Sequence, residues 1–162
     1  MAVSDYFLKI DGIEGESQDS KHKGEIELRS WSWCETNTGS SAYGGGGGTG
    51  KISMQDFHFT KKLDKASPKL MEACAKGKSC PTAVAVVRKA GGEQQDYMKI
   101  TFSDVFISSY SIGGSGGDDP IPMDTVSFNF GKIDFEYKEQ KADGTLGGAT
   151  SGKYDLKTNK AG

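Results

Sequence analysis

The sequence predicts a mainly β protein, a two-sheet antiparallel β-barrel or sandwich with one short flanking α-helix. Most apolar stretches alternate with polar residues at a period of two, as half-buried strands do. Two stretches, 97–112 and 124–139, are long and move their apolar residues to the opposite face midway. Long strands that change face usually turn a corner between two packed sheets. We therefore expect the corners of a small barrel at these two places.

Length and composition favour one soluble domain spanning 1–162. A chain of 162 residues is long enough to bury a core, and its net charge of −2 leaves no basic stripe for nucleic acid. No stretch approaches 18 apolar residues, and the N-terminus has neither a basic region nor a long apolar one. We thus expect no membrane span and no cleaved signal peptide.

The first half of the chain is expected to contain three strands. Residues 6–10 form the first, and a polar surface loop over 14–23 follows, in which His22 is expected to be solvated. In the second strand, 25–35, the apolar residues change faces near Ser30, as in a bent strand or one buried on both sides. The third strand covers 51–61.

One helix is predicted between the strands. Ser67 suits the N-cap, Pro68 the first helical position and Gly77 the C-terminal end. Leu70, Met71 and Cys74 would face the sheet. After this helix we expect strands over 82–89 and over the two long segments, with a bulge at Gly131 and a loosely held tail over about 145–162.

A glycine run separates the second and third strands. Gly44 to Gly48 are consecutive, and Gly50 follows after Thr49. Because ordering glycine costs more backbone entropy than ordering other residues, we expect a flexible arm over about 40–50. Gly45, Gly50 and Lys51 match the phosphate-binding pattern G-x-x-x-x-G-K, but Ile52 replaces the magnesium-binding Ser or Thr and a strand replaces the helix.

Few residues indicate chemistry. The chain has two histidines in unlike contexts and three cysteines at irregular spacing. This favours a reducing compartment, no metal site and no cofactor, and we expect no enzyme activity. Trp31 and Trp33 lie two residues apart on one strand face, where they suit either a ligand-stacking platform or a core anchor. A monomeric β-sandwich that binds a ligand through these two indoles is the alternative function.

Four motifs resemble one family in order and spacing: W-S-W at 31–33, Q-D-F-x-F-T-K at 55–61, K-A-G-G at 89–92 and Y-K-x-Q-K-A-D-G at 137–144. They resemble the haemolysin-coregulated protein (Hcp) family, the tube subunit of the bacterial type VI secretion system. The resemblance covers about 3–144. Cys34 and Cys80 depart from the residue types common in the family.

The resemblance implies a secreted structural protein that assembles as a hexameric ring. Rings would stack into a phage-tail-like tube, which a contracting sheath drives outward behind a spike protein, with effector proteins held in the lumen. The protein would start in the bacterial cytoplasm and leave through the secretion apparatus. The arm that contacts the adjacent ring would comprise Tyr43, Gly44, Gly45, Gly46, Gly47, Gly48, Thr49 and Gly50. Ser32 would face the lumen and contact effectors.

Overall fold

The computed structural model describes the whole chain except residues 1–3, 40–50, 90–93 and 119–120. Its elements are β1 (Ser4–Ile10), β2 (Ile26–Leu28), β3 (Ser30–Ser32), β4 (Glu35–Asn37), β5 (Ile52–Met54), β6 (Phe57–Lys62), α1 (Ala66–Lys76), β7 (Ser79–Lys89), β8 (Asp96–Gly113), β9 (Met123–Asn129), β10 (Lys132–Gln140), β11 (Leu146–Asp155) and β12 (Lys160–Ala161).

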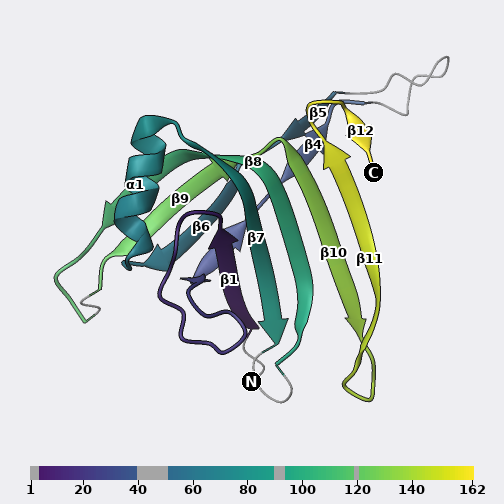
Figure 1. Ribbon diagram of the computed structural model, residues 1–162, viewed down its shortest axis with the longest axis horizontal. Coiled ribbons are helices and arrows are strands. Elements are labelled where there is room, and N and C mark those ends of the chain that lie inside the picture. Colours follow the sequence, from purple (N-terminus) through teal and green to yellow (C-terminus); the bar gives the residue numbers. More distant parts are fainter. Residues whose placement is uncertain (1–3, 40–50, 90–93, 119–120) are drawn as a thin grey trace.

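The long strand β8 belongs to two sheets, as the sequence predicted. Its N-terminal half pairs with β7 and β10 in a sheet of order β12-β11-β10-β8-β7-β1-β2. Its C-terminal half pairs with β9 in a branch of order β3-β6-β9-β8, which is continuous with the first part through β8 and which we call the second sheet. The pairing shifts register between Ile107 and Ser109, where the face change was expected. Figure 1 shows β8 crossing the molecule between the two layers.

The second corner lies at Arg29. The segment 25–35 is not one strand: β2 pairs with β1 in the first sheet, and β3 pairs with β6 in the second. Only Arg29 separates them, and its backbone N–H donates to the carbonyl of Thr60. The apolar residues change faces here because the chain passes from one sheet to the other. With both corners in place, the strands surround the core in a barrel-like arrangement.

Aromatic rings from both sheets fill the core. Phe57, Phe59 and Phe128 come from the second sheet and Phe102 from the first, and all four are fully buried. The Phe57 ring centre lies 5.0 Å from that of Phe128 and 5.2 Å from that of Phe102. These contacts join the two layers.

The helix α1 packs against β8 and covers one side of the barrel (Figure 1). It ends at Gly77, whose positive φ of 63° favours glycine, as predicted. Its start differs from the prediction because Ala66 is already helical and Lys65 is the N-cap. Leu70 is buried as expected, but Met71 is exposed, since Ala66, Ser67 and Ala73 complete the buried side.

A buried ion pair anchors the start of this helix. Lys61 Nζ lies 2.5 Å from Asp124 Oδ2, and neither side chain is exposed to solvent. Lys61 also donates to Asp64 and to Ser67 Oγ, and Ser67 Oγ donates to Asp124. Tyr110 also belongs to this cluster, because its hydroxyl donates to Asp124 at 3.0 Å. Nothing in the sequence analysis singled out this cluster.

The C-terminal third of the chain differs most from expectation. The segment 124–139 is two strands, because the chain breaks at Phe130 and Gly131 between β9 and β10. A Cβ on Gly131 would lie 3.4 Å from the Cβ of Asp104, so the backbone passes close to the turn of β8. The expected loose tail was also wrong. Its residues include β11, which pairs with β10 from Lys132 to Gln140, and β12, which pairs with the end of β11.

Candidate functional site

The outward face of the four-stranded sheet β3-β6-β9-β8 carries hydroxyl groups in two complete cross-strand rows. Residues paired across an antiparallel ladder lie on the same face of the sheet. The first row is Ser30, Thr60, Thr125 and Ser111, and the second is Ser32, His58, Ser127 and Ser109. Seven of these eight residues carry a hydroxyl group, and the eighth is the exposed His58. We call this surface the hydroxyl face.

Part of the hydroxyl face is internally hydrogen-bonded and part is open to a partner. Ser30 and Thr60 share a hydrogen bond of 2.6 Å, and Ser109 and Ser127 share one of 2.5 Å. Ser32, Ser111 and Thr125 are exposed, and within the described residues their hydroxyls have no side-chain partner. Neither row contains a carboxylate or an ammonium group. The face can therefore form neutral hydrogen bonds over several strands.

The two tryptophans lie on the other side of this sheet from Ser32. Trp31 pairs with Phe59 and its ring stacks on Phe57 at 5.9 Å, and both indoles are half-buried against the core. They are therefore core anchors in the isolated chain and not an exposed stacking platform. Ser32 lies on the exposed hydroxyl face, and its contact with effectors remains a prediction.

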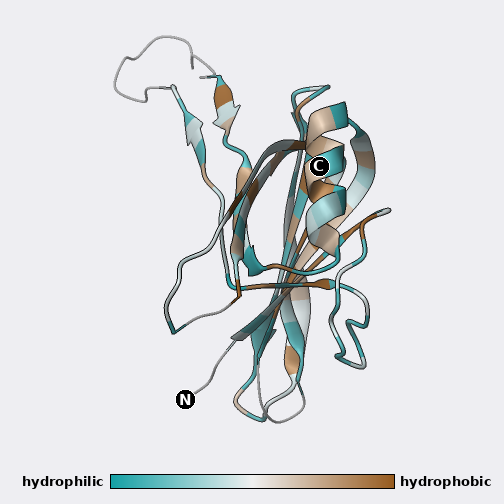
Figure 2. Cartoon of the chain, turned by 90° about the vertical axis from the view of Figure 1, so that its left-hand side faces the viewer, coloured by the Kyte–Doolittle hydropathy of each residue, from teal (hydrophilic) through white to brown (hydrophobic). Residues whose placement is uncertain are grey.

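The predicted arm, from Tyr43 to Gly50, lies outside the described residues. Its flanking strands β4 and β5 pair with each other and project from the layered body, at the upper left of Figure 2. The strand β5 starts at Ile52, directly after Lys51. The single strand expected over 51–61 is in fact two strands, β5 and β6, which belong to different sheets. A strand directly after Lys51 agrees with the prediction and supplies no helix N-terminus of the kind that a phosphate-binding loop needs.

Both edges of the four-stranded sheet are open in the described part of the chain. Within those residues, β3 pairs only with β6. Beyond Phe106, β8 pairs only with β9, because the pairing of β7 with β8 ends at Phe106. Unpaired backbone N–H and C=O groups at such edges are ready to pair with another strand.

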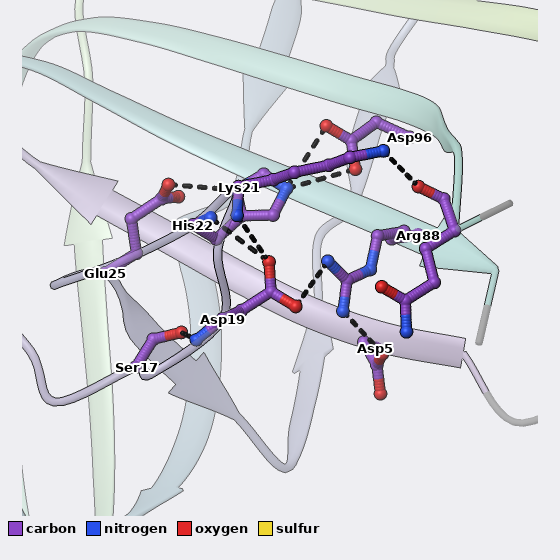
Figure 3. A network of polar contacts seen from close by, with 9 residues as sticks. Asp5, Ser17, Asp19, Lys21, His22, Glu25, Arg88 and Asp96 are labelled. Carbon is purple, nitrogen blue, oxygen red and sulfur yellow. Dashed lines mark hydrogen bonds and ion pairs between the residues drawn. The ribbon is translucent and has the colours of Figure 1, made fainter. Parts of the chain in front are cut away.

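The loop 14–25 is held on the first sheet by a polar network that the sequence analysis missed (Figure 3). His22 was expected to be solvated, but only 6% of it is exposed. Its ring stacks on Phe7 at 4.4 Å, Nδ1 lies 2.8 Å from Glu25, and Nε2 lies 3.0 Å from Asp96. The expectation failed because Phe7 and Asp96 are distant in sequence.

Arg88 forms the other half of this network. Arg88 is 2% exposed, and its guanidinium lies 3.0 Å from Asp5 and 2.7 Å from Asp19 and contacts the Phe7 ring. The hydrogen bond from Arg88 lowers the pKa of the Asp19 carboxyl below its ordinary value. The network ties the loop to β1 and β7, so its role is structural.

The environment of His22 predicts a pH dependence of stability. Burial lowers the pKa of His22, but hydrogen bonds and charges from Asp96 and Glu25 outweigh this and raise it. A raised pKa contributes stability that is full below the unfolded pKa of about 6.5 and is lost as pH rises through the folded pKa. We expect the free energy of unfolding in urea to be larger at about pH 6 than at about pH 8.5.

The two histidines allow a matched control for this effect. His22→Gln should remove most of the pH dependence, whereas the exposed His58→Gln should leave it unchanged. An equal pH dependence in wild type and His22→Gln would contradict the assignment to His22.

Among the described residues, no group of three or more His, Cys, Asp or Glu side chains is arranged to hold a metal ion. Nor does any helix in the described ranges have the length and apolar character of a membrane crossing. The cysteines found there are free thiols, of which Cys80 is buried and Cys34 exposed.

Comparisons with known proteins specify the class of protein to which this barrel-like fold with its open-edged sheet belongs. A family model described as "Type VI secretion system effector, Hcp" matches residues 7–137. Protein hcp1 of Pseudomonas aeruginosa is 52% identical over 149 residues, which cover 91% of each chain. The chain belongs to the Hcp family of type VI secretion system proteins.

Solved structures agree with this assignment. The crystal structure of Hcp1 from Salmonella typhimurium is 39% identical, with a TM-score of 0.81 and 99% of each chain covered. A structure described as a type six secretion system protein is 31% identical, with a TM-score of 0.93 over 99% of this chain and 100% of the other. The family resemblance and the mainly β fold predicted from the sequence are thus confirmed.

Proposed function

We propose that this chain is the secreted tube subunit of a type VI secretion system, and that six copies close into a ring. The observation that carries the proposal is the open-edged sheet β3-β6-β9-β8. All of its neighbouring strands are antiparallel, and their number is even. The end strand β8 of one copy can therefore pair antiparallel with β3 of the next. Head-to-tail contacts of this kind generate closed rings.

In such a ring the hydroxyl face lines the lumen. One continuous sheet would place Ser32 and its row neighbours on the same side in every copy. A wall rich in hydroxyl groups can hydrogen-bond to effector proteins, because each hydroxyl group can both donate and accept. Rings would stack through the arm Tyr43–Gly50 into a tube that works with sheath and spike proteins. The protein would act without enzyme activity, as a virulence-related carrier that starts in the cytoplasm and is exported.

Native mass tests the ring. Light scattering coupled to size exclusion should give about six times the 17.3 kDa of one chain. A monomer at micromolar concentration would contradict the ring.

Deleting Gly44–Gly48 tests the role of the arm. The shortened chain should keep its fold and the mass of six copies, because β4 and β5 pair with each other outside this run. Stacking of rings, measured by sedimentation at high protein concentration, should weaken. A variant that unfolds, or that stacks as well as wild type, would contradict this role.

A further inference from the structure

An apolar groove begins at Trp33, the residue that directly follows β3. It separates the β4–β5 ladder from the first sheet and has a volume of about 460 Å³. Its apolar lining is Trp33, Ile52, Met54, Ile133, Phe135 and Tyr154. The Phe135 side chain is 38% exposed, and the neighbouring Tyr137 on the same face of β10 is 45% exposed. Exposed apolar surface of this kind commonly marks an interaction site.

The opposite edge of the same sheet carries a protruding apolar side chain. Ile112, near the end of β8, is 49% exposed although it pairs with the fully buried Asp124. It is exposed because β8 lacks a neighbour on its outer side there. Ile112 lies on the core-facing side of the sheet, like Trp31, and not on the hydroxyl face.

The two features lie on opposite sides of the molecule. In Figure 1 the C-terminal end of β8, which leads toward β9, is at the left beside α1, whereas β10 and β11 are at the right. A head-to-tail ring repeats the molecule side by side, so the left side of one copy meets the right side of the next. Strands of a closed barrel are also tilted by about 35–45° to its axis, so successive copies are offset along the strand direction.

We infer that Ile112 of one copy inserts into the groove of Trp33, Phe135 and Tyr154 of the next copy. The inference rests on the proposed ring and adds its lateral anchor. Pairing of β8 with β3 puts Ile112 and Trp33 on one side of the joined sheet, which is the side where the groove opens. We take the occupant of the groove to be a second copy of this chain, because the chain carries both the protruding Ile112 and the apolar groove, on the two sides that the ring brings together.

Charged and polar variants at the two sites test the contact. Ile112→Asp and Phe135→Ser should fold, because both side chains are exposed in the single chain. Each should raise the concentration at which rings dissociate by about 30-fold or more, as loss of an interface hot spot does. The matched control is Ser151→Asp, which adds the same charge to β11 on the face opposite the groove residues Gly152 and Tyr154 and should keep the ring.

Paired cysteines test the geometry directly. With the exposed Cys34 changed to Ser, the double variant Ile112→Cys and Phe135→Cys should form disulfide-linked ladders of up to six chains under oxidising conditions. Either cysteine alone should give no such ladder. Two results would overturn this inference while the wild type still forms a ring: Ile112→Asp and Phe135→Ser leave the dissociation of the ring unchanged, or the double cysteine variant gives no ladder. Either result would leave the proposed function standing. A wild-type monomer would instead overturn the proposed ring itself.

Discussion

Replacing Asp124 by alanine is expected to lower the free energy of unfolding by about 3–5 kcal/mol, because it leaves a buried ammonium group without its main counter-charge. Lys61 and Asp124 are both fully buried, and their charged atoms lie 2.5 Å apart. Ser67 and Tyr110 would lose their acceptor as well. Asp64, 2.8 Å from Lys61, retains part of the counter-charge, so we expect the lower end of this range. Urea unfolding at fixed protein concentration measures the loss.

A double variant separates the effect of charge from that of packing. Lys61→Met combined with Asp124→Leu removes both charges and keeps apolar volume at both positions. It should recover more than half of the stability lost in Asp124→Ala. If Asp124→Ala stays within about 1 kcal/mol of wild type, the pair is not the anchor of α1 that its burial indicates.

A second readout follows Tyr110. Burial, together with the hydrogen bond and charge of Asp124, raises the pKa of the Tyr110 hydroxyl above its ordinary value. Asp124→Ala should therefore lower that pKa, which a spectrophotometric titration of the folded protein can follow.

Local patterns predicted the parts of the fold that depend on neighbouring residues. The shift of apolar parity within 97–112 located the corner in β8, and the change near Ser30 located the passage from β2 to β3. Gly77 marked the end of α1 because a left-handed residue there favours glycine. Each of these signals lies within a few residues of the feature that it marks.

Features that depend on distant partners were not predicted. Lys61 meets Asp124, 63 residues away, and His22 meets Asp96, 74 residues away. One signal was present for Lys61, which shares strand parity with the buried Phe57 and Phe59. His22 had no comparable signal, because it lies in a loop whose covering role depends on the placement of β1 and β7.

The strand β11 was missed for a different reason. Most of its residues are exposed, and Gly148 and Gly152 lie on the same strand face as Tyr154, where an alternating pattern would have apolar side chains. Its pairing with β10 is carried by backbone hydrogen bonds, which leave no mark on composition. The hydroxyl face could not be predicted for a related reason, because it depends on strand pairing that composition does not reveal. Ser32 could be chosen from its own strand, but its row neighbours required the registers of three further strands.

Replacing Phe57 by alanine is expected to lower the free energy of unfolding by about 3–5 kcal/mol, because the cavity would open where the two sheets meet. The Phe57 side chain is fully buried. Its ring contacts Phe128 within its own sheet, Phe102 in the first sheet and Trp31 beside the β3 edge. Loss of this ring removes contacts on three sides at once. Urea unfolding, followed by far-UV circular dichroism, measures the change.

The fluorescence of Trp31 gives a second readout of this variant, at the edge strand β3 of the proposed ring contact. With the stacked ring gone, the indole of Trp31 gains water contact, and the emission of the folded protein should move to longer wavelength. Met71→Ala, which truncates an exposed side chain on α1, should change both readouts little. A loss below about 1 kcal/mol in Phe57→Ala would mean that neighbouring rings close the cavity. Because β3 carries Trp31 and pairs only with β6 in the described chain, loosening this stack should also weaken the edge on which the proposed ring depends.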